Sequence, residues 1–188
     1  MRLFIGIKLD SNAIEQIEKF LKPFKKVNTP IKWVKPGTVH ITLKFIGEVP
    51  DSQYSKIQQS LSEAFSALKP GEFDVTFKGC GKFGKKDSLN IFWIGIAPSD
   101  PLIKIYETIE STLSRLGIPR EERDFTPHIT VGRNKREYNF KSLFALIDEL
   151  SDQQIVNMHV HGFQLFKSDL KPDGPVYTIL KEIPLASI

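Results

Sequence analysis

The stretch Val39-His40-Ile41-Thr42-Leu43-Lys44-Phe45 has a counterpart further along the chain, Pro127-His128-Ile129-Thr130-Val131-Gly132-Arg133. Each contains a histidine followed two residues later by a threonine. Side chains two apart on a β-strand point to the same face, so each stretch predicts a strand that presents an imidazole beside a hydroxyl. The apolar residues expected to anchor the first strand in a core are Val39, Ile41, Leu43 and Phe45.

The two motifs lie in matching surroundings. Phe4-Ile5-Gly6-Ile7 precedes the first motif and Trp93-Ile94-Gly95-Ile96 precedes the second, so that His40 follows Gly6 by 34 residues and His128 follows Gly95 by 33. One such pair alone would indicate only the polar face of an ordinary sheet. Its duplication indicates an internal repeat, with a first copy over about 1–88 and a second over about 89–188.

Length and composition limit the class of protein. A chain of 188 residues fits one compact domain or one domain of two lobes. A formal charge of +4 and a pI near 9.1 favour anionic partners but do not prove nucleic-acid binding. No apolar run reaches the ~18 residues of a membrane span, and we expect a cytoplasmic location. The single cysteine, Cys80, excludes an internal disulfide and is expected to be a packed side chain.

Hydrophobic periodicity predicts the remaining elements. Besides the motif strands, strands are expected near residues 2–9, 31–34, 73–77, 89–96, 155–166 and 176–183. Helices are expected after caps at Asp10 or Ser11, Asp51 or Ser52, and Asp100, and over residues 140–150. Pro23 should disrupt the last turn of the first helix, and the glycine-rich segment 79–88 should be a mobile loop.

Each half therefore runs strand, helix, motif strand, helix, strand. This order predicts an α+β fold of two pseudo-symmetric lobes, each an antiparallel sheet with helices packed on its outer face. The two motif strands would face each other across an active-site groove between the lobes.

The chain resembles the RNA 2′,3′-cyclic phosphodiesterases, also called 2′-5′ RNA ligases, of the two-histidine phosphoesterase superfamily. The resemblance runs the length of the chain. It is carried by residues 2–7, 33–34, 40–47, 80–83, 92–95, 123–133 and 168–170, with Gly174 and Tyr177. Gly84 departs from the family pattern, which has a proline at this position after Phe83.

The resemblance implies one bilobal phosphoesterase domain over 1–188, acting without a metal or other cofactor. It makes His40 the general acid and His128 the general base. It also implies that Thr42 and Thr130 hold phosphate oxygens. Arg133, which lies close behind the second motif, matches a basic residue that binds the substrate.

The chemistry fits these residue types independently. Opening a 2′,3′-cyclic phosphate removes a proton from water and gives one to the departing ribose oxygen. Histidine titrates near neutral pH and can do both. Hydrolysis with departure of the 3′ oxygen leaves a 2′-phosphate, and an RNA 5′-hydroxyl in place of water would give 2′-5′ ligation without ATP.

Two other functions are considered. His159-Val160-His161 places two imidazoles on one face of a strand, as in a metal-dependent hydrolase, although the sequence offers no third ligand at a characteristic distance. A non-catalytic RNA-binding domain would use the basic segment Lys82–Lys86 with Phe83 as a stacking platform. Neither function explains the paired motifs.

The expected partner is RNA with 2′,3′-cyclic phosphate ends, with tRNA fragments as one candidate. We expect a monomer that needs no membrane and no obligate protein partner.

Overall fold

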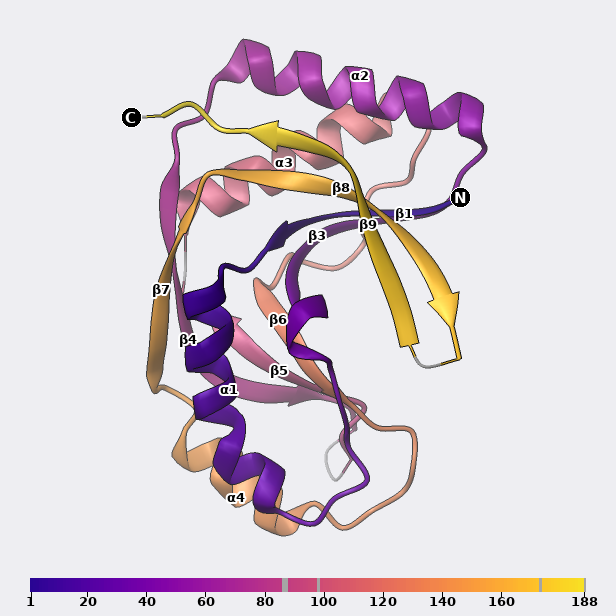
Figure 1. The fold of residues 1–188 in the computed structure, drawn as a ribbon. Helices are drawn as coiled ribbons and strands as arrows, with labels where there is room; N and C mark the ends of the chain where they lie inside the picture. Colours follow the sequence, from indigo (N-terminus) through magenta and orange to yellow (C-terminus); the bar gives the residue numbers. More distant parts are fainter. Residues whose placement is uncertain (86–87, 98, 173, 188) are drawn as a thin grey trace.

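The chain folds into a mixture of helices and strands in the computed structural model, which describes residues 1–85, 88–97, 99–172 and 174–187 (Figure 1). The helices are α1 (Ser11–Lys26), α2 (Asp51–Leu68), α3 (Asp100–Ser114) and α4 (Lys141–Glu149), with a 3₁₀ turn, η1 (Pro36–Thr38). The strands are β1 (Arg2–Lys8), β2 (Lys32–Trp33), β3 (His40–Glu48), β4 (Phe73–Phe83), β5 (Ile91–Ile96), β6 (His128–Arg133), β7 (Gln154–Val160), β8 (Gly162–Lys171) and β9 (Gly174–Pro184).

The strands form one curled sheet in the order β7-β4-β5-β6-β3-β1-β8-β9, with β2 beside β6. Paired strands run antiparallel. Between β3 and β6 the register consists of one pair, Ile41 with Ile129, and here the sheet divides into two lobes. The predicted α+β class with two lobes is confirmed.

Each lobe draws on both halves of the chain. The first lobe contains β1, β3, β8 and β9, and α2 and α3 pack on it; Phe65 of α2 meets Phe163 of β8 at 4.6 Å between ring centroids. The second lobe contains β4 to β7 and is covered by α1 and α4, with Phe24 of α1 against Phe92 of β5 at 5.0 Å. Figure 1 shows α2 and α3 at one end of the molecule and α1 and α4 at the other.

The helix ends differ in detail from the prediction. Asp10 caps α1 as expected, since its side chain accepts from the Ala13 N–H at 2.6 Å. The helix continues past Pro23 to Lys26. The N-cap of α3 is Ser99 rather than Asp100, and that of α2 is Pro50, which has no side chain able to accept a hydrogen bond.

Two strand boundaries were predicted wrongly. The segment expected to be a loop from Gly79 begins as strand, because β4 continues to Phe83 and pairs with β5; residues 86–87 lie outside the described ranges. A glycine is needed at Gly81 because a Cβ there would lie 2.3 Å from the Trp93 ring. The single strand expected over 155–166 is two strands, β7 and β8, separated at His161.

The predicted core face of the first motif is correct only to Leu43. Between Gly6 and Ile5 of β1, the partner on β3 shifts from Thr42 to Lys44, which is a β-bulge. A bulge adds one residue to a strand and reverses which face the following side chains occupy. Phe45 is therefore 59% exposed, while Lys44 is 4% exposed and forms an ion pair with Glu110 at 2.8 Å.

Apolar residues three or four apart on the helices supply much of the remaining core. Ile17, Phe20 and Phe24 of α1 are buried, as are Ile57, Leu61 and Phe65 of α2. Cys80 is buried, as predicted. Within the described ranges, none of the helices combines the length with the apolar character that a membrane crossing requires.

Candidate active site

The two histidine motifs meet at the junction of the lobes. Ile41 and Ile129 are paired between β3 and β6, and both are fully buried. Continuing this antiparallel register by one residue on either side sets His40 across from Thr130, and Thr42 across from His128. Diagonal neighbours in such a ladder have Cα atoms about 7–8 Å apart. The four polar side chains, which are half-buried, therefore form one patch on the face opposite the helices.

Both imidazoles are held in the same way. Nδ1 of His40 lies 2.8 Å from the Thr38 carbonyl oxygen, and Nδ1 of His128 lies 2.7 Å from the Thr126 carbonyl oxygen. A carbonyl oxygen only accepts hydrogen bonds, so Nδ1 is the donor in each ring. Nε2 of each ring is thus the nitrogen left to accept or release a proton.

Aromatic rings support both histidines from neighbouring strands. Phe4 of β1 lies 4.7 Å from His40 between ring centroids, and Tyr177 of β9 lies 5.2 Å from it, edge-on. Phe83 of β4 and Trp93 of β5 lie 5.1 Å and 6.4 Å from His128. The sequence interpretation gave Phe83 a role only as a stacking platform in the alternative RNA-binding function and gave the other three rings none. Phe4 and Trp93 nevertheless occupy the same place in the repeat, two residues before Gly6 and Gly95.

Arg133 reaches the patch because of a second β-bulge. Trp93 pairs with Thr130 whereas Phe92 pairs with Gly132, which leaves Val131 as the extra residue on β6. The bulge places Arg133 on the same face as Thr130 instead of the opposite one. Phe45, at the equivalent position behind the first motif, is likewise turned by the bulge there onto the exposed face that carries His40 and Thr42.

Burial is the main reason that the pKa of His40 lies below its ordinary value. Its hydrogen bond with Thr38 opposes this shift, and the positive charge of Arg133 adds to it. His40 is consequently neutral at neutral pH in the free protein.

Tyr177 is a site residue to which the sequence interpretation gave no role. Burial raises the pKa of its hydroxyl, and the charges of Arg133 and Arg2 act in the opposite direction. The resemblance of the tail pointed to this tyrosine, but its contact with His40 depends on the pairing of β9 in the first lobe.

The structure does not bring His159 and His161 to the paired histidines. His159 lies on β7, and β4 and β5 separate this strand from β6. Three strand spacings correspond to about 14 Å. A metal ion held by these two histidines would therefore not lie at His40 and His128.

The basic segment is only partly available for RNA. Lys82 donates from Nζ to the carbonyl oxygens of Lys85 and Ser88, both at 3.0 Å, and its Nζ lies 4.6 Å from the Phe144 ring. These contacts hold Lys82 against its own lobe. Lys86 lies outside the described residues, while Phe83 faces His128.

Comparison with known proteins agrees with the fold and the paired motifs. The family model described as 2′-5′ RNA ligase superfamily matches residues 11–172. A Methanocaldococcus jannaschii protein named RNA 2′,3′-cyclic phosphodiesterase is 35% identical over 182 residues, covering 97% of this chain and 99% of its own. A Thermotoga maritima protein of the same name is 34% identical, covering 97% of this chain and 94% of its own.

Solved structures share the same architecture. TT0787 of Thermus thermophilus superposes with a TM-score of 0.78 at 25% identity, over 100% of this chain and 99% of that one. Escherichia coli LigT complexed with 3′-AMP superposes with a TM-score of 0.77 at 24% identity, over 98% and 97%. The fold is thus that of the two-lobed phosphoesterases. The chain belongs to the 2′-5′ RNA ligase superfamily, as its motifs predicted.

Proposed function

We infer that this protein is a phosphodiesterase that opens 2′,3′-cyclic phosphate ends of RNA and leaves a 2′-phosphate. The observation that carries this function is the pair of imidazoles on β3 and β6, each with Nδ1 bonded to a backbone carbonyl and Nε2 left for proton transfer. The names of relatives at 34% and 35% identity over nearly the whole chain support the same substrate class.

In the proposed reaction, Nε2 of His128 accepts a proton from water as the water oxygen bonds to phosphorus. The bond between phosphorus and the ribose 3′ oxygen breaks, and Nε2 of His40 gives that oxygen a proton. Hydroxyls of Thr42 and Thr130 donate to the non-bridging oxygens, and Arg133 compensates their growing negative charge. No step requires a metal ion or other cofactor.

The low pKa of His40 constrains the acid role. In the free protein His40 is neutral, which is the state of a base, because burial and Arg133 disfavour its charged form. The bound phosphate is an anion, so it favours the imidazolium and raises the pKa of His40. Binding of substrate therefore prepares His40 to act as the acid.

Ligation follows from the same arrangement. If an RNA 5′-hydroxyl replaces water, His128 accepts its proton and the product is a 2′-5′ linkage, formed without ATP. We propose ligation as a side activity of this site.

We further propose one bilobal domain over 1–188, built on repeats of about 1–88 and 89–188, that acts as a cytoplasmic monomer without an obligate protein partner. Its RNA would include tRNA fragments with cyclic phosphate ends. The matching strands Phe4–Ile7 and Trp93–Ile96, each paired with a motif strand, support the repeat. Light scattering of the purified chain tests the monomer.

The decisive experiment is an assay on an RNA oligonucleotide that ends in a 2′,3′-cyclic phosphate, in the presence of a strong chelator. We expect turnover to a 2′-phosphate, identified by resistance of the product to an enzyme that removes only 3′-phosphates. Saturable RNA binding without turnover would instead support a non-catalytic binding domain. Loss of activity on chelation would support a metal-dependent hydrolase.

A further inference from the structure

A second group of histidines lies at the edge of the second lobe, apart from the proposed active site. On β4 and β7, Asp74 pairs with His159 and Phe73 pairs with Val160. Continuing this register by one residue sets Glu72 across from His161. Phe73 and Val160 are buried, so the four polar side chains share the opposite face. We call Glu72, Asp74, His159 and His161 the edge cluster.

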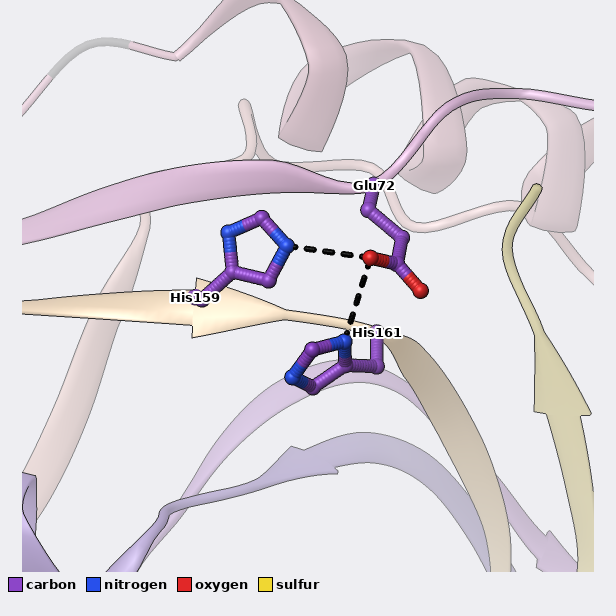
Figure 2. A group of neighbouring side chains, drawn as sticks. All are labelled: Glu72, His159 and His161. Carbon is purple, nitrogen blue, oxygen red and sulfur yellow. Dashed lines mark hydrogen bonds and ion pairs between the residues drawn. The ribbon is translucent and has the colours of Figure 1, made fainter. Parts of the chain in front are cut away.

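Three atoms of the edge cluster converge on one point. Oε2 of Glu72 lies 3.1 Å from Nε2 of His159 and 3.2 Å from Nδ1 of His161 (Figure 2). The three ligand atoms all lie within 4.8 Å of one another. In a tetrahedral zinc site with bonds of about 2.0–2.2 Å, two ligand atoms are about 3.3–3.5 Å apart. Small side-chain rotations would therefore admit a cation.

The backbone fixes the positions of these ligands. The Glu72 N–H donates to the Ala186 oxygen at 3.0 Å, and the Leu185 N–H donates to the His161 oxygen at 2.8 Å. Residues 185–186 thus tie the start of β4 to the junction of β7 and β8. The ligands come from segments that are already held together.

Asp74 occupies the position of an outer partner. Its Oδ1 lies 2.7 Å from Nδ1 of His159, on the ring edge away from Glu72. A histidine that binds a metal through one nitrogen commonly donates from the other to a carboxylate, which fixes the ring. The edge cluster thus has three inner ligands and one outer carboxylate.

We propose that Glu72, His159 and His161 bind a divalent transition-metal cation of the zinc class. Two imidazoles and a carboxylate suit Zn²⁺, Co²⁺ or Ni²⁺ better than Mg²⁺ or Ca²⁺, which prefer all-oxygen sites. The side chains of His159 and His161 are 42% and 73% exposed, which leaves room for water to complete the coordination. The ion joins the start of β4 to the β7–β8 junction and takes no part in opening the cyclic phosphate.

Titration of the chelator-treated full chain tests this site. We expect one equivalent of Zn²⁺ by calorimetry, one equivalent of Co²⁺ by visible absorption, and a rise in melting temperature on adding Zn²⁺. His161→Ala removes an exposed inner ligand and should weaken binding on the order of 100-fold; Asp74→Asn should weaken it about 10- to 100-fold. His128→Ala, the matched control, should bind as the parent does.

Two results would overturn the proposal. One is the absence of saturable binding by the parent protein. The other is unchanged affinity in both His161→Ala and Glu72→Gln, shown by circular dichroism to be folded, since the ion would then bind elsewhere. Both readings are independent of the proposed function, because phosphodiesterase turnover is measured in chelator.

Discussion

The proposed active site and the edge cluster are built on the same plan and differ in their electrostatics. Each is a square of four polar side chains from two antiparallel strands or the residues that directly adjoin them. A buried apolar pair lies in the middle of each square: Ile41 with Ile129 at the centre of the sheet, and Phe73 with Val160 at its edge. The central square has hydroxyls and a nearby arginine, whereas the edge square has carboxylates.

The pKa values of His40 and His159 are shifted in opposite directions. Burial lowers the pKa of His40, and Arg133 lowers it further, whereas the hydrogen bonds of Asp74 and Glu72 raise the pKa of His159. In the central site, Nε2 of each histidine has no hydrogen-bond partner among the residues that the structure describes, and it is left for proton transfer. At the edge both nitrogens of His159 already have carboxylate partners, so this ring is suited to metal coordination instead. Neighbouring groups, more than the histidine itself, decide which chemistry is available.

The largest expected effect is the fall in kcat/KM when either central histidine, His40 or His128, is replaced. His40→Ala or His128→Ala should each lower kcat/KM for a cyclic phosphate by about 10²–10⁴-fold, because each removes a group to which we assign a proton transfer. The double variant should lose less than the product of the single losses, because the two groups act as a unit. Steady-state kinetics on variants with parental circular dichroism measures this. Turnover within a few-fold of the parent for either single variant would show that the central histidines do not transfer protons in the reaction.

Shortening a side chain in either buried apolar pair should lower the free energy of unfolding and misplace the polar side chains beside it. Ile41→Ala removes a fully buried side chain and should cost about 2–5 kcal/mol in the free energy of unfolding, while misplacing His40 and Thr42. Val160→Ala removes fewer atoms, so it should cost less and weaken cation binding. Urea denaturation, kinetics and metal titration measure these effects. If Ile41→Ala lost stability but kept parental kcat/KM, the buried pair would not position the motif.

Replacing Arg133 tests whether positive charge beside the central square assists the reaction. Arg133→Ala should lower kcat/KM by about 10- to 100-fold, the equivalent of one charged hydrogen bond worth about 1.5–3 kcal/mol. Because Arg133 is proposed to contact the phosphate itself, a cyclic mononucleotide should be affected as much as RNA. The same variant should raise the pKa of His40, as followed by NMR titration.

Arg136→Ala is the matched control for Arg133, since it removes an exposed arginine from the loop that follows β6. It should alter only the salt dependence of RNA binding. Equal losses in both variants would mean that positive charge in general, and no contact of Arg133, assists the reaction.

The smallest expected effect is on stability at acid pH. The pKa of His40 is lowered from 6.5 on folding, so below about pH 6.5 the unfolded chain takes up this proton first and stability falls. The loss grows until the pH passes the folded pKa and is absent above the unfolded value. His40→Gln should therefore lose less stability than the parent between pH 7 and pH 5 in matched urea titrations. An equal or greater loss in the variant would contradict the lowered pKa.

Local pattern was enough to predict much of this protein. The alternation of His40 and Thr42 with Ile41, and of His128 and Thr130 with Ile129, needs only the two-residue period of a strand. The helical stripes of α1 and α2 follow from the 3.6-residue period in the same way. The duplication of the motif indicated a paired site, and the resemblance supplied the roles of its members.

Other features depended on pairing between distant segments. Bulges opposite Gly6 and Trp93 turn Phe45 and Arg133 toward the site, and their positions follow from which partner residues align across the sheet. The packing of α1 on the second lobe and of α3 on the first was likewise not visible in the order of elements.

The amino-acid sequence by itself determined the paired motifs, the class of the fold and the family, because these depend on residue type and short-range spacing. Only the tertiary structure decided that Glu72 meets His159 and His161, residues 87 and 89 positions away. The reason is that the register between β4 and β7 is set by the packing of their buried side chains in the assembled sheet, and no local spacing specifies it.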